Sequence, residues 1–225
     1  MTANQIYRVS AWSLIVGAVI AFISLLYSGL VFVGDPTILG SRPDYLWVNA
    51  LTVVGVAMLL LGLPGWFGSR AASAGVIGLI GMICIFLTGL VFGVFLSLLQ
   101  ALIFPYLAAQ APQAVAGQGP PDLGGVFISG TILNVVGAVL LAITVLRSRA
   151  QPMWTGYVWI ACAVMAVVSV FVSGPSATNV VTSVLGVASG LLLFVALFGF
   201  GADMLSRHGA NASPGSPRRG STASA

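Results

Sequence analysis

Charged side chains are nearly absent from this sequence. They make up 5% of the 225 residues, and lysine and glutamate do not occur at all. Soluble domains carry about 25% charged residues, so this scarcity excludes an ordinary soluble domain. The eight arginines stand singly or in pairs at the ends of apolar runs. That arrangement is typical of topology signals in membrane proteins and argues against a nucleic-acid-binding face.

Residues suited to catalysis or metal binding are equally scarce. One histidine, His208, provides neither a zinc cluster nor a bis-histidine haem pair. Both cysteines, Cys84 and Cys162, lie inside apolar runs, which argues against a disulfide framework. No ionisable residue falls in the middle of an apolar run, so proton relays lack their groups, and a serine nucleophile would lack its base. We therefore expect a non-enzymatic protein with no catalytic residue, no cofactor and no metal site.

Apolar side chains, in contrast, account for 59% of the residues. They form runs long enough to cross a bilayer, which takes about 20 helical residues. These runs predict helices at about 12–33, 46–63, 74–104, 126–146, 154–172 and 179–200. The expected fold is all-α, an integral membrane bundle of six transmembrane helices in one domain, 1–202. The remainder, 203–225, is rich in Ser, Gly, Pro, Ala and Arg, so we expect a disordered tail.

Proline and glycine mark the connections between these runs. Pro64-Gly65 is expected to end the second span and to start a tight turn to the third. Phe104-Pro105 is expected to close the third span. The longest internal connection, about 105–125, follows, with a short helix predicted over Tyr106–Ala111.

The distribution of arginines predicts the orientation of the chain. With six spans, seven of the eight arginines share one side, and only Arg42 lies on the other. The positive-inside rule then places both termini in the cytoplasm of a multi-pass protein in the cell membrane. The aromatic residues fit the same frame: we expect Trp12, Trp66, Trp154 and Tyr157 at the inner interface and Tyr45, Trp47 and Tyr106 at the outer one.

Small residues recur along several of the expected helices. In the third span, one face of an α-helix would carry Gly75, Gly78, Met82, Gly89, Gly93 and Gln100. The opposite face would carry Ile80, Ile83, Cys84, Leu87, Val91, Val94 and Leu98, directed at lipid. The first span has a similar small stripe, with Gly17 and Ala21 among serines. Such stripes let neighbouring helices approach closely.

Four amide side chains are the candidates for a polar path. Asn134 lies near the middle of the fourth span, whereas Asn49, Gln100 and Asn179 lie near outer ends. Two interpretations remain open. Asn134 could bond to a neighbouring helix in a structural role, with the other three as interfacial anchors, or all four could contact a solute or ion. Near the outer ends, Asp35, Arg42 and Asp44 are expected to pair within one loop.

A longer stretch resembles known proteins. The run LLLGLPGWFGSRAASAGVIGLIGMICIFLTG, followed by FPYLAAQAP and LRSRAQPMW, is similar to small polytopic membrane proteins of high-GC bacteria. Their pattern is LGLPGLY, then GxxGLxGF, with a Pro-x-Leu-Ala-Ala loop and a Leu-Arg-x-Arg loop. Here Trp66-Phe67 stands near the usual Leu-Tyr, and Met82 replaces Phe. The resemblance covers roughly residues 59–154 and implies a bacterial inner membrane, with no known activity.

Two functions are compatible with these features. The first, favoured by the small stripes and the lack of buried charge, is helix contact with a second copy or another membrane protein. The alternative is a small transporter or channel for a neutral or weakly polar solute. It draws on a faint repeat, LTVVG at 51–55, LNVVG at 133–137 and TSVLG at 182–186, which records either duplicated hairpins or chance. The partners expected are the lipid bilayer and either a second copy of the chain or another membrane protein, not nucleic acid.

Overall fold

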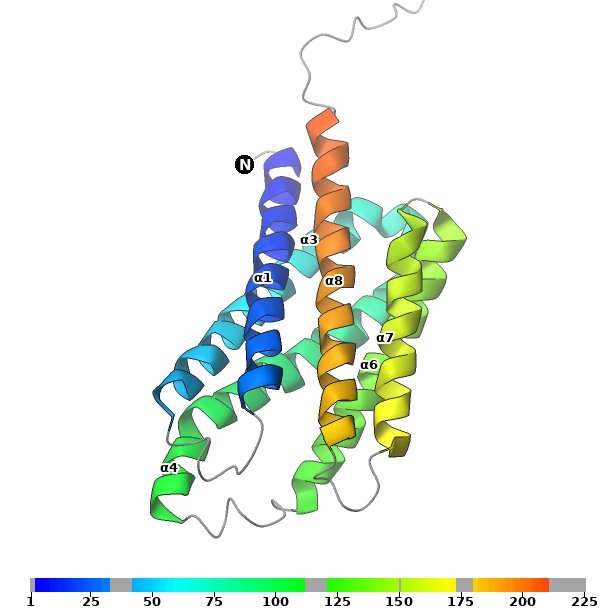
Figure 1. Cartoon of the computed structure of the whole chain (residues 1–225). Helices are drawn as coiled ribbons and strands as arrows, with labels where there is room; N and C mark the ends of the chain where they lie inside the picture. Colours follow the sequence, from blue (N-terminus) through cyan, green and yellow to red (C-terminus); the bar gives the residue numbers. More distant parts are fainter. Residues whose placement is uncertain (1–2, 33–41, 112–120, 150, 173–179, 211–225) are drawn as a thin grey trace, which may run out of the picture.

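A computed structural model describes residues 3–32, 42–111, 121–149, 151–172 and 180–210, and helices make up almost all of them. In chain order these are α1 (Ala3–Val31), α3 (Pro43–Thr88), the π-helical η1 (Gly89–Leu96) and η2 (Leu99–Ile103), α4 (Phe104–Gln110), α6 (Pro121–Ser148), α7 (Met153–Val172) and α8 (Val180–Ala210). No strand occurs within these ranges, so the all-α expectation is confirmed (Figure 1). Helix α4 contains most of the short helix expected over Tyr106–Ala111. It follows η2 without a break, however, so the prediction that Phe104-Pro105 closes the third span is wrong.

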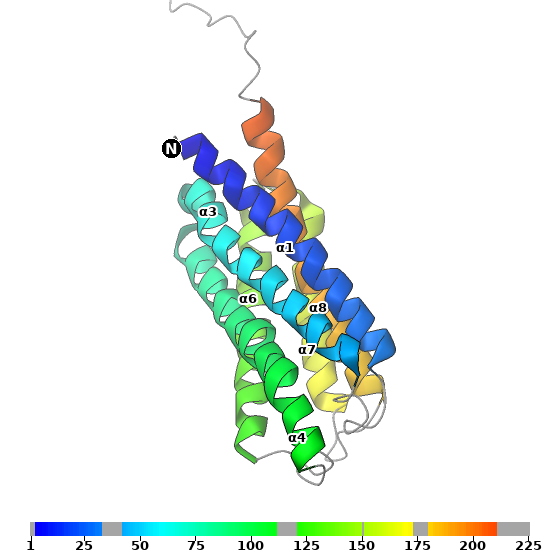
Figure 2. The same ribbon diagram turned by 90° about the vertical axis from the view of Figure 1, so that its left-hand side faces the viewer.

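Helix α3 reverses its direction at Gly75, as Figures 1 and 2 show. Gly75 has φ 58° and ψ −161°, a conformation that is essentially restricted to glycine. Beyond it the chain returns along its own first half. A Cβ atom built on Gly89 would lie 2.9 Å from Cδ2 of Leu60, and one on Gly93 would lie 2.6 Å from the methyl groups of Val56. Residues 43–74 and 76–103 therefore pack against each other as antiparallel helices.

Because α3 is one helix in spite of its reversal at Gly75, it counts as a single candidate span. By length and apolar composition, five helices of the described residues could cross a membrane: Asn4–Val31, Pro43–Gln110, Gly125–Ser148, Met153–Val172 and Val184–Arg207. The second of them is 68 residues long and includes both expected spans, 46–63 and 74–104. The break predicted at Pro64-Gly65 is wrong, because the helix continues through Pro64. A membrane helix tolerates proline, whereas the reversal needs a backbone conformation that proline cannot adopt.

The helical segments form a ring in the order of the chain (Figures 1 and 2). The first half of α3 packs on α1, its second half on α6, α6 on α7, α7 on α8, and α8 returns to α1. Neighbours run antiparallel: Gly62 lies against Leu14, and Gly55 lies against Ala21, about two turns further along α1. The start of α1 and the end of α8 lie at the same end of the bundle.

Small residues permit the closest of these contacts. A Cβ atom on Gly17 would lie 2.6 Å from the backbone oxygen of Gly55, so α1 and α3 touch backbone to backbone. The serine part of the same stripe also faces α3, since Ser13 Oγ donates a hydrogen bond to the carbonyl of Met58 over 2.6 Å. The small stripe predicted for the first span is thus confirmed as a packing face.

The faces predicted for the third span are only partly right. Ile80, Ile83 and Leu87 are exposed on the outside of the bundle, as expected for residues directed at lipid. Cys84 was assigned to that outer face but is buried, and a Cβ atom on Gly137 of α6 would lie 3.0 Å from its Cβ. The helix has a neighbour on each side, which widens its buried face, and the π-helical turns after Thr88 change the spacing from that of an α-helix.

The end of the helical domain also lies later than expected. Helix α8 continues to Ala210, and Asp203 and Met204 are buried, so a tail beginning at residue 203 is wrong. The reason is tertiary, because Asp203 binds an arginine of α3. Residues 211–225 lie outside the described residues.

Candidate functional site

The ring of helices encloses a cavity of about 520 Å³. Its wall includes residues from α1, both halves of α3, η1, η2, α6, α7 and α8. Most of the wall is apolar, with Leu25, Val56, Phe92, Phe127 and Phe194 among its residues. A volume in the range of small-molecule pockets, with a few polar groups in an apolar wall, is typical of a ligand site.

Three of the four amides singled out from the sequence meet in this cavity. Asn49 comes from the start of α3, Gln100 from η2 and Asn134 from the middle of α6, and all three line the wall. Asn49 is buried and its Nδ2 donates to the carbonyl of Tyr45 over 2.8 Å. The fourth amide, Asn179, lies outside the described residues.

Asn134 is the amide with an unmet hydrogen bond. Its side chain is 9% exposed, and Oδ1 is buried without a hydrogen-bond partner in the structure. The same side chain reaches the thiol of Cys162 on α7. A buried carbonyl oxygen without a donor costs roughly 1–3 kcal/mol, so Asn134 is the least satisfied of the three amides. The structural interpretation, in which Asn134 bonds to a neighbouring helix, explains the contact with Cys162 but leaves the oxygen Oδ1 without a partner.

Hydroxyl groups make up the rest of the polar wall. They are those of Ser28, Thr52, Thr88, Ser97, Thr131, Ser169 and Ser189. Among the described residues, no arginine, aspartate or histidine lines the cavity. The site is therefore polar without being charged, and an ion inside it would have no opposite charge for compensation.

The cavity ends at one side against tightly packed side chains. Leu63 and Leu197 line the cavity at this end, and both are almost fully buried. Beyond them Trp66 stacks on Phe200, with Trp159 tilted against the same ring. Trp66 is 1% exposed, so its indole packs inside the bundle and does not face the surface as an interfacial anchor would. Tyr45 is buried as well, and the interface positions expected for both residues stay predictions.

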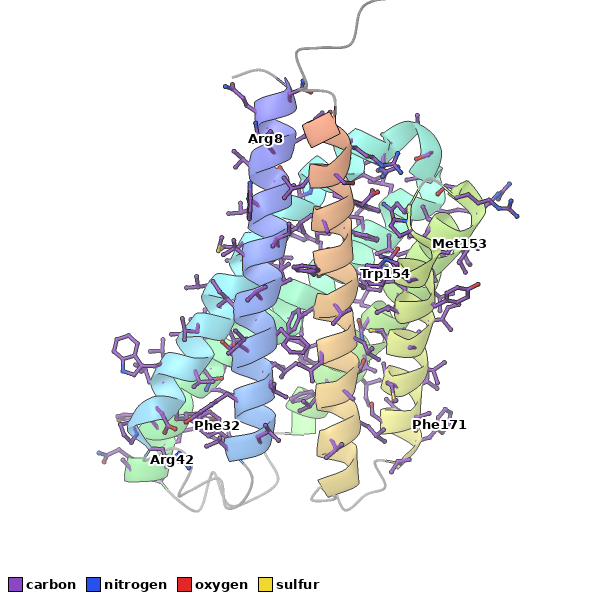
Figure 3. The ribbon with its side chains drawn as sticks, turned by 45° about the horizontal axis from the view of Figure 1, so that its top comes forward. Arg8, Phe32, Arg42, Met153, Trp154 and Phe171 are labelled. Carbon is purple, nitrogen blue, oxygen red and sulfur yellow. The ribbon has the colours of Figure 1, made fainter. Side chains whose placement is uncertain are left out.

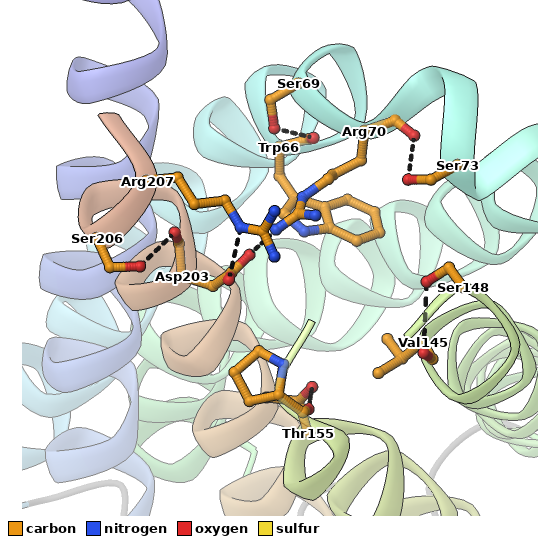
Figure 4. A network of polar contacts seen from close by, with 11 residues as sticks. Trp66, Ser69, Arg70, Ser73, Val145, Ser148, Thr155, Asp203, Ser206 and Arg207 are labelled. Atoms are coloured by element: carbon orange, nitrogen blue, oxygen red, sulfur yellow. Dashed lines mark hydrogen bonds and ion pairs between the residues drawn. The ribbon is translucent and has the colours of Figure 1, made fainter. Parts of the chain in front are cut away.

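A buried ion pair lies next to these rings (Figure 4). Nη2 of Arg70 on α3 contacts Oδ2 of Asp203 on α8, and both side chains are less than a tenth exposed. Arg207, one turn further along α8, donates from Nε to the other carboxylate oxygen over 3.1 Å. A second cavity beside this network, lined in part by Gln151, measures only about 10 Å³, so it has no room for a solute.

Sequence reasoning missed this ion pair. Arg70 was interpreted as an orientation signal and Asp203 as the first residue of the tail. A signal was present, because Asp203 and Arg207 are four residues apart at the end of an apolar run, the spacing of a helical ion pair.

The opposite end of the bundle carries an exposed ion pair (Figure 3). Arg42 binds Asp44 over 2.8 Å, which confirms the predicted pairing of these two residues. Tyr27 of α1 donates to the same carboxylate over 2.8 Å, and the Arg42 guanidinium lies over the ring of Phe32. These contacts tie the end of α1 to the start of α3, near Asn49.

Within the described part of the chain, no three His, Cys, Asp or Glu side chains lie close enough together to hold a metal ion. The amides and hydroxyls of the cavity are instead suited to hydrogen bonding with a small molecule. Comparisons of the chain with protein-family models, with curated proteins and with solved structures find no match.

Proposed function

We propose that the chain crosses a bacterial inner membrane six times, with both termini in the cytoplasm. The support is the reversal at Gly75, which gives α3 two antiparallel halves. An even number of crossings also agrees with the common end shared by the start of α1 and the end of α8 (Figure 1). Arg8 lies at that end and Arg42 at the other (Figure 3), in keeping with the excess of arginines expected on the cytoplasmic side.

Within this topology, we propose that the protein binds a neutral small molecule in the cavity and carries it across the membrane. The observation that supports this function is the convergence of Asn49, Gln100 and Asn134 on one uncharged cavity inside the bundle. Transport sites commonly lie inside the bundle, near the middle of the membrane. The packed rings and the Arg70–Asp203 pair close the cytoplasmic end, so the cavity is not a continuous pore. A closed end of this kind fits a transporter better than a channel.

The other function expected from the sequence, contact with a second copy or another membrane protein, has lost its main support. The small residues that favoured it are used inside this chain: Gly17 and Gly55 bring α1 and α3 together, and Gly201 packs against Ala11. A non-enzymatic role through helix contacts thus remains a prediction, because the small residues that would form such contacts already pack within this chain.

The direct test is mass spectrometry of small molecules that co-purify with the protein in mild detergent. The matched control is Gly186→Leu. Gly186 lines the cavity, and a Cβ atom built on it meets nothing within 4 Å, so a larger side chain there starts in open space and reduces the free volume of the cavity. We expect a neutral compound that is enriched with the parent and lost from the variant. Equal small-molecule content in the two preparations would contradict the proposal.

A further inference from the structure

Six of the seven hydroxyl groups around the cavity donate their proton to a backbone carbonyl. Thr52 donates to the carbonyl of Val48 over 3.0 Å, Thr88 to that of Cys84 over 2.9 Å. Thr131 donates to the carbonyl of Phe127 over 2.8 Å. A hydroxyl has one proton and two lone pairs. Once the proton is committed to the preceding helical turn, the group offers the cavity lone pairs only.

Two serines of the wall behave in the same way. Ser189 Oγ donates to the carbonyl of Cys162 on the neighbouring helix over 3.2 Å, and Ser97 Oγ donates to that of Phe92 over 3.4 Å. The wall therefore presents hydroxyl oxygens that can accept hydrogen bonds. They come from α3, α6 and α8 and from Ser97, which lies between η1 and η2, and these segments face one another across the cavity.

The amides carry donors as well as acceptors. Nδ2 of Asn49 gives one of its two protons to the carbonyl of Tyr45, and its oxygen lies outside that bond. Oδ1 of Asn134 is buried without a partner, and Gln100 brings a third amide to the wall. The excess of acceptors therefore comes from the hydroxyl groups. The buried N–H groups of the nearby indoles do not compensate, because neither Trp66 nor Trp159 lines the cavity.

We propose that the cavity selects neutral molecules that donate hydrogen bonds and carry a compact hydrocarbon part, such as alcohols. This inference rests on the proposed function, since it specifies the ligand of the same cavity. An anion would face lone pairs on several sides. A cation would lose its hydration in a wall with no carboxylate among the described residues. The apolar residues around the acceptors accommodate the hydrocarbon.

The test uses four probes with the same six-carbon ring: cyclohexanol, methoxycyclohexane, cyclohexanecarboxylate and cyclohexylammonium. Their binding is measured by ligand-observed saturation-transfer NMR on the full chain in lipid nanodiscs, with empty nanodiscs subtracted. Cyclohexanol should bind about three- to tenfold more tightly than the ether, the factor expected for one hydrogen bond. It should bind more tightly than both ions as well.

Two variants test the residues. Thr88→Val keeps the shape of the side chain and removes one acceptor from the wall, and Asn134→Leu removes the amide. Each should reduce the preference for cyclohexanol over methoxycyclohexane. Thr88→Val keeps the test informative if Asn134→Leu fails to fold.

The outcomes separate this inference from the function on which it rests. Equal or tighter binding of the ether, the carboxylate or the ammonium, with loss of that binding in Gly186→Leu, would overturn the donor selectivity and leave the solute cavity standing. If no probe distinguishes the parent from Gly186→Leu, the solute cavity itself fails and the selectivity fails with it.

Discussion

Trp66 and Phe200 lie face to face, with ring centroids 4.2 Å apart and ring planes only 2° from parallel. Trp159 contacts the same phenyl ring at 5.7 Å, tilted by 45°. The three rings come from α3, α8 and α7, so one aromatic cluster joins three members of the ring of helices. Because it lies between the cavity and the Arg70–Asp203 pair, the cluster closes the cavity as well as stabilising the bundle.

Truncation of Trp66 should therefore destabilise the protein strongly. Substitution of a buried tryptophan by alanine typically costs about 3–5 kcal/mol of stability. The stacking contact with Phe200 is lost as well. We expect Trp66→Ala to lower the melting temperature in detergent clearly more than Trp47→Ala, because Trp47 is 68% exposed. Equal decreases would mean that the cluster contributes little to stability.

The Arg70–Asp203 pair should show strong energetic coupling. Removal of one partner from a buried pair costs about 3–5 kcal/mol when it leaves an uncompensated charge. Asp203→Leu does so by leaving Arg70 without its carboxylate, whereas Arg70→Leu leaves Asp203 paired with Arg207, so we expect the larger loss for Asp203→Leu. Arg70→Leu and Asp203→Leu should each lower the melting temperature, and the double variant should lose much less than the sum. Additive losses would indicate that the two side chains do not interact in the folded protein.

The exposed pair provides the control for this cycle. Arg42 and Asp44 make a similar contact, but their side chains are 39% and 29% exposed. Exposed pairs contribute about 0–1 kcal/mol, so Arg42→Leu and Asp44→Leu should change the melting temperature little.

Gly75→Ala should destabilise the protein through the backbone alone. A Cβ atom at Gly75 or at Gly186 meets nothing within 4 Å, but only Gly75 of the two has a positive φ. A non-glycine residue in such a conformation costs on the order of 1–3 kcal/mol. In thermal unfolding, Gly75→Ala should therefore be less stable than the parent, and Gly186→Ala equal to it or more stable. A harmless Gly75→Ala would show that the reversal does not depend on this conformation.

Bulk at the contact between the two halves of α3 should force them apart. Gly89→Leu places its side chain against Leu60, where even a Cβ atom would come within 2.9 Å. Leu87→Phe enlarges a side chain that is 40% exposed on the outside. Overpacking typically costs about 1–3 kcal/mol, and Gly→Leu raises helix propensity, so the loss in Gly89→Leu is steric. A greater loss of melting temperature for Leu87→Phe would reverse the assignment of the two faces.

Six crossings can be checked with topology reporters. Fusions after Gly75, Arg149 and Ala225 should report the cytoplasm, and fusions after Arg42 and Gln118 should report the outside. A cytoplasmic signal at Gln118 would contradict the proposed topology. The fusion after Gly75 is informative because it separates the two halves of α3.

Composition and apolar run length were enough to predict a helical bundle with α7 placed within one residue at each end. They could not locate the reversal in α3, because Pro64-Gly65 is the stronger local breaker and Gly75 is one glycine among 28. The actual bend depends on the packing of both halves, which no local pattern records. The faint repeat of the second, fourth and sixth spans stays a prediction. Its three final glycines differ in their surroundings, because Gly55 and Gly137 lie in tight contacts and Gly186 has open space around it.

The sequence was enough to predict that amide side chains would form the candidate site. It was not enough to predict which groups of the site donate and which accept hydrogen bonds. An amide within an apolar run is visible in the sequence, and Asn49, Gln100 and Asn134 all reached the cavity. The threonine hydroxyls were not singled out, because their importance depends on which way each proton points. The buried ion pair joins residues 133 positions apart, a separation at which the sequence alone gives no pairing information.

The order of the ring has a consequence for biosynthesis. Each helix packs on the one translated just before it, so assembly can keep pace with the ribosome until α8 returns to α1. Arg70 must wait for Asp203, 133 residues later, or on the order of ten seconds at usual rates of synthesis. A chain that stalls before α8 would lack the carboxylate that binds Arg70 and one wall of the cavity.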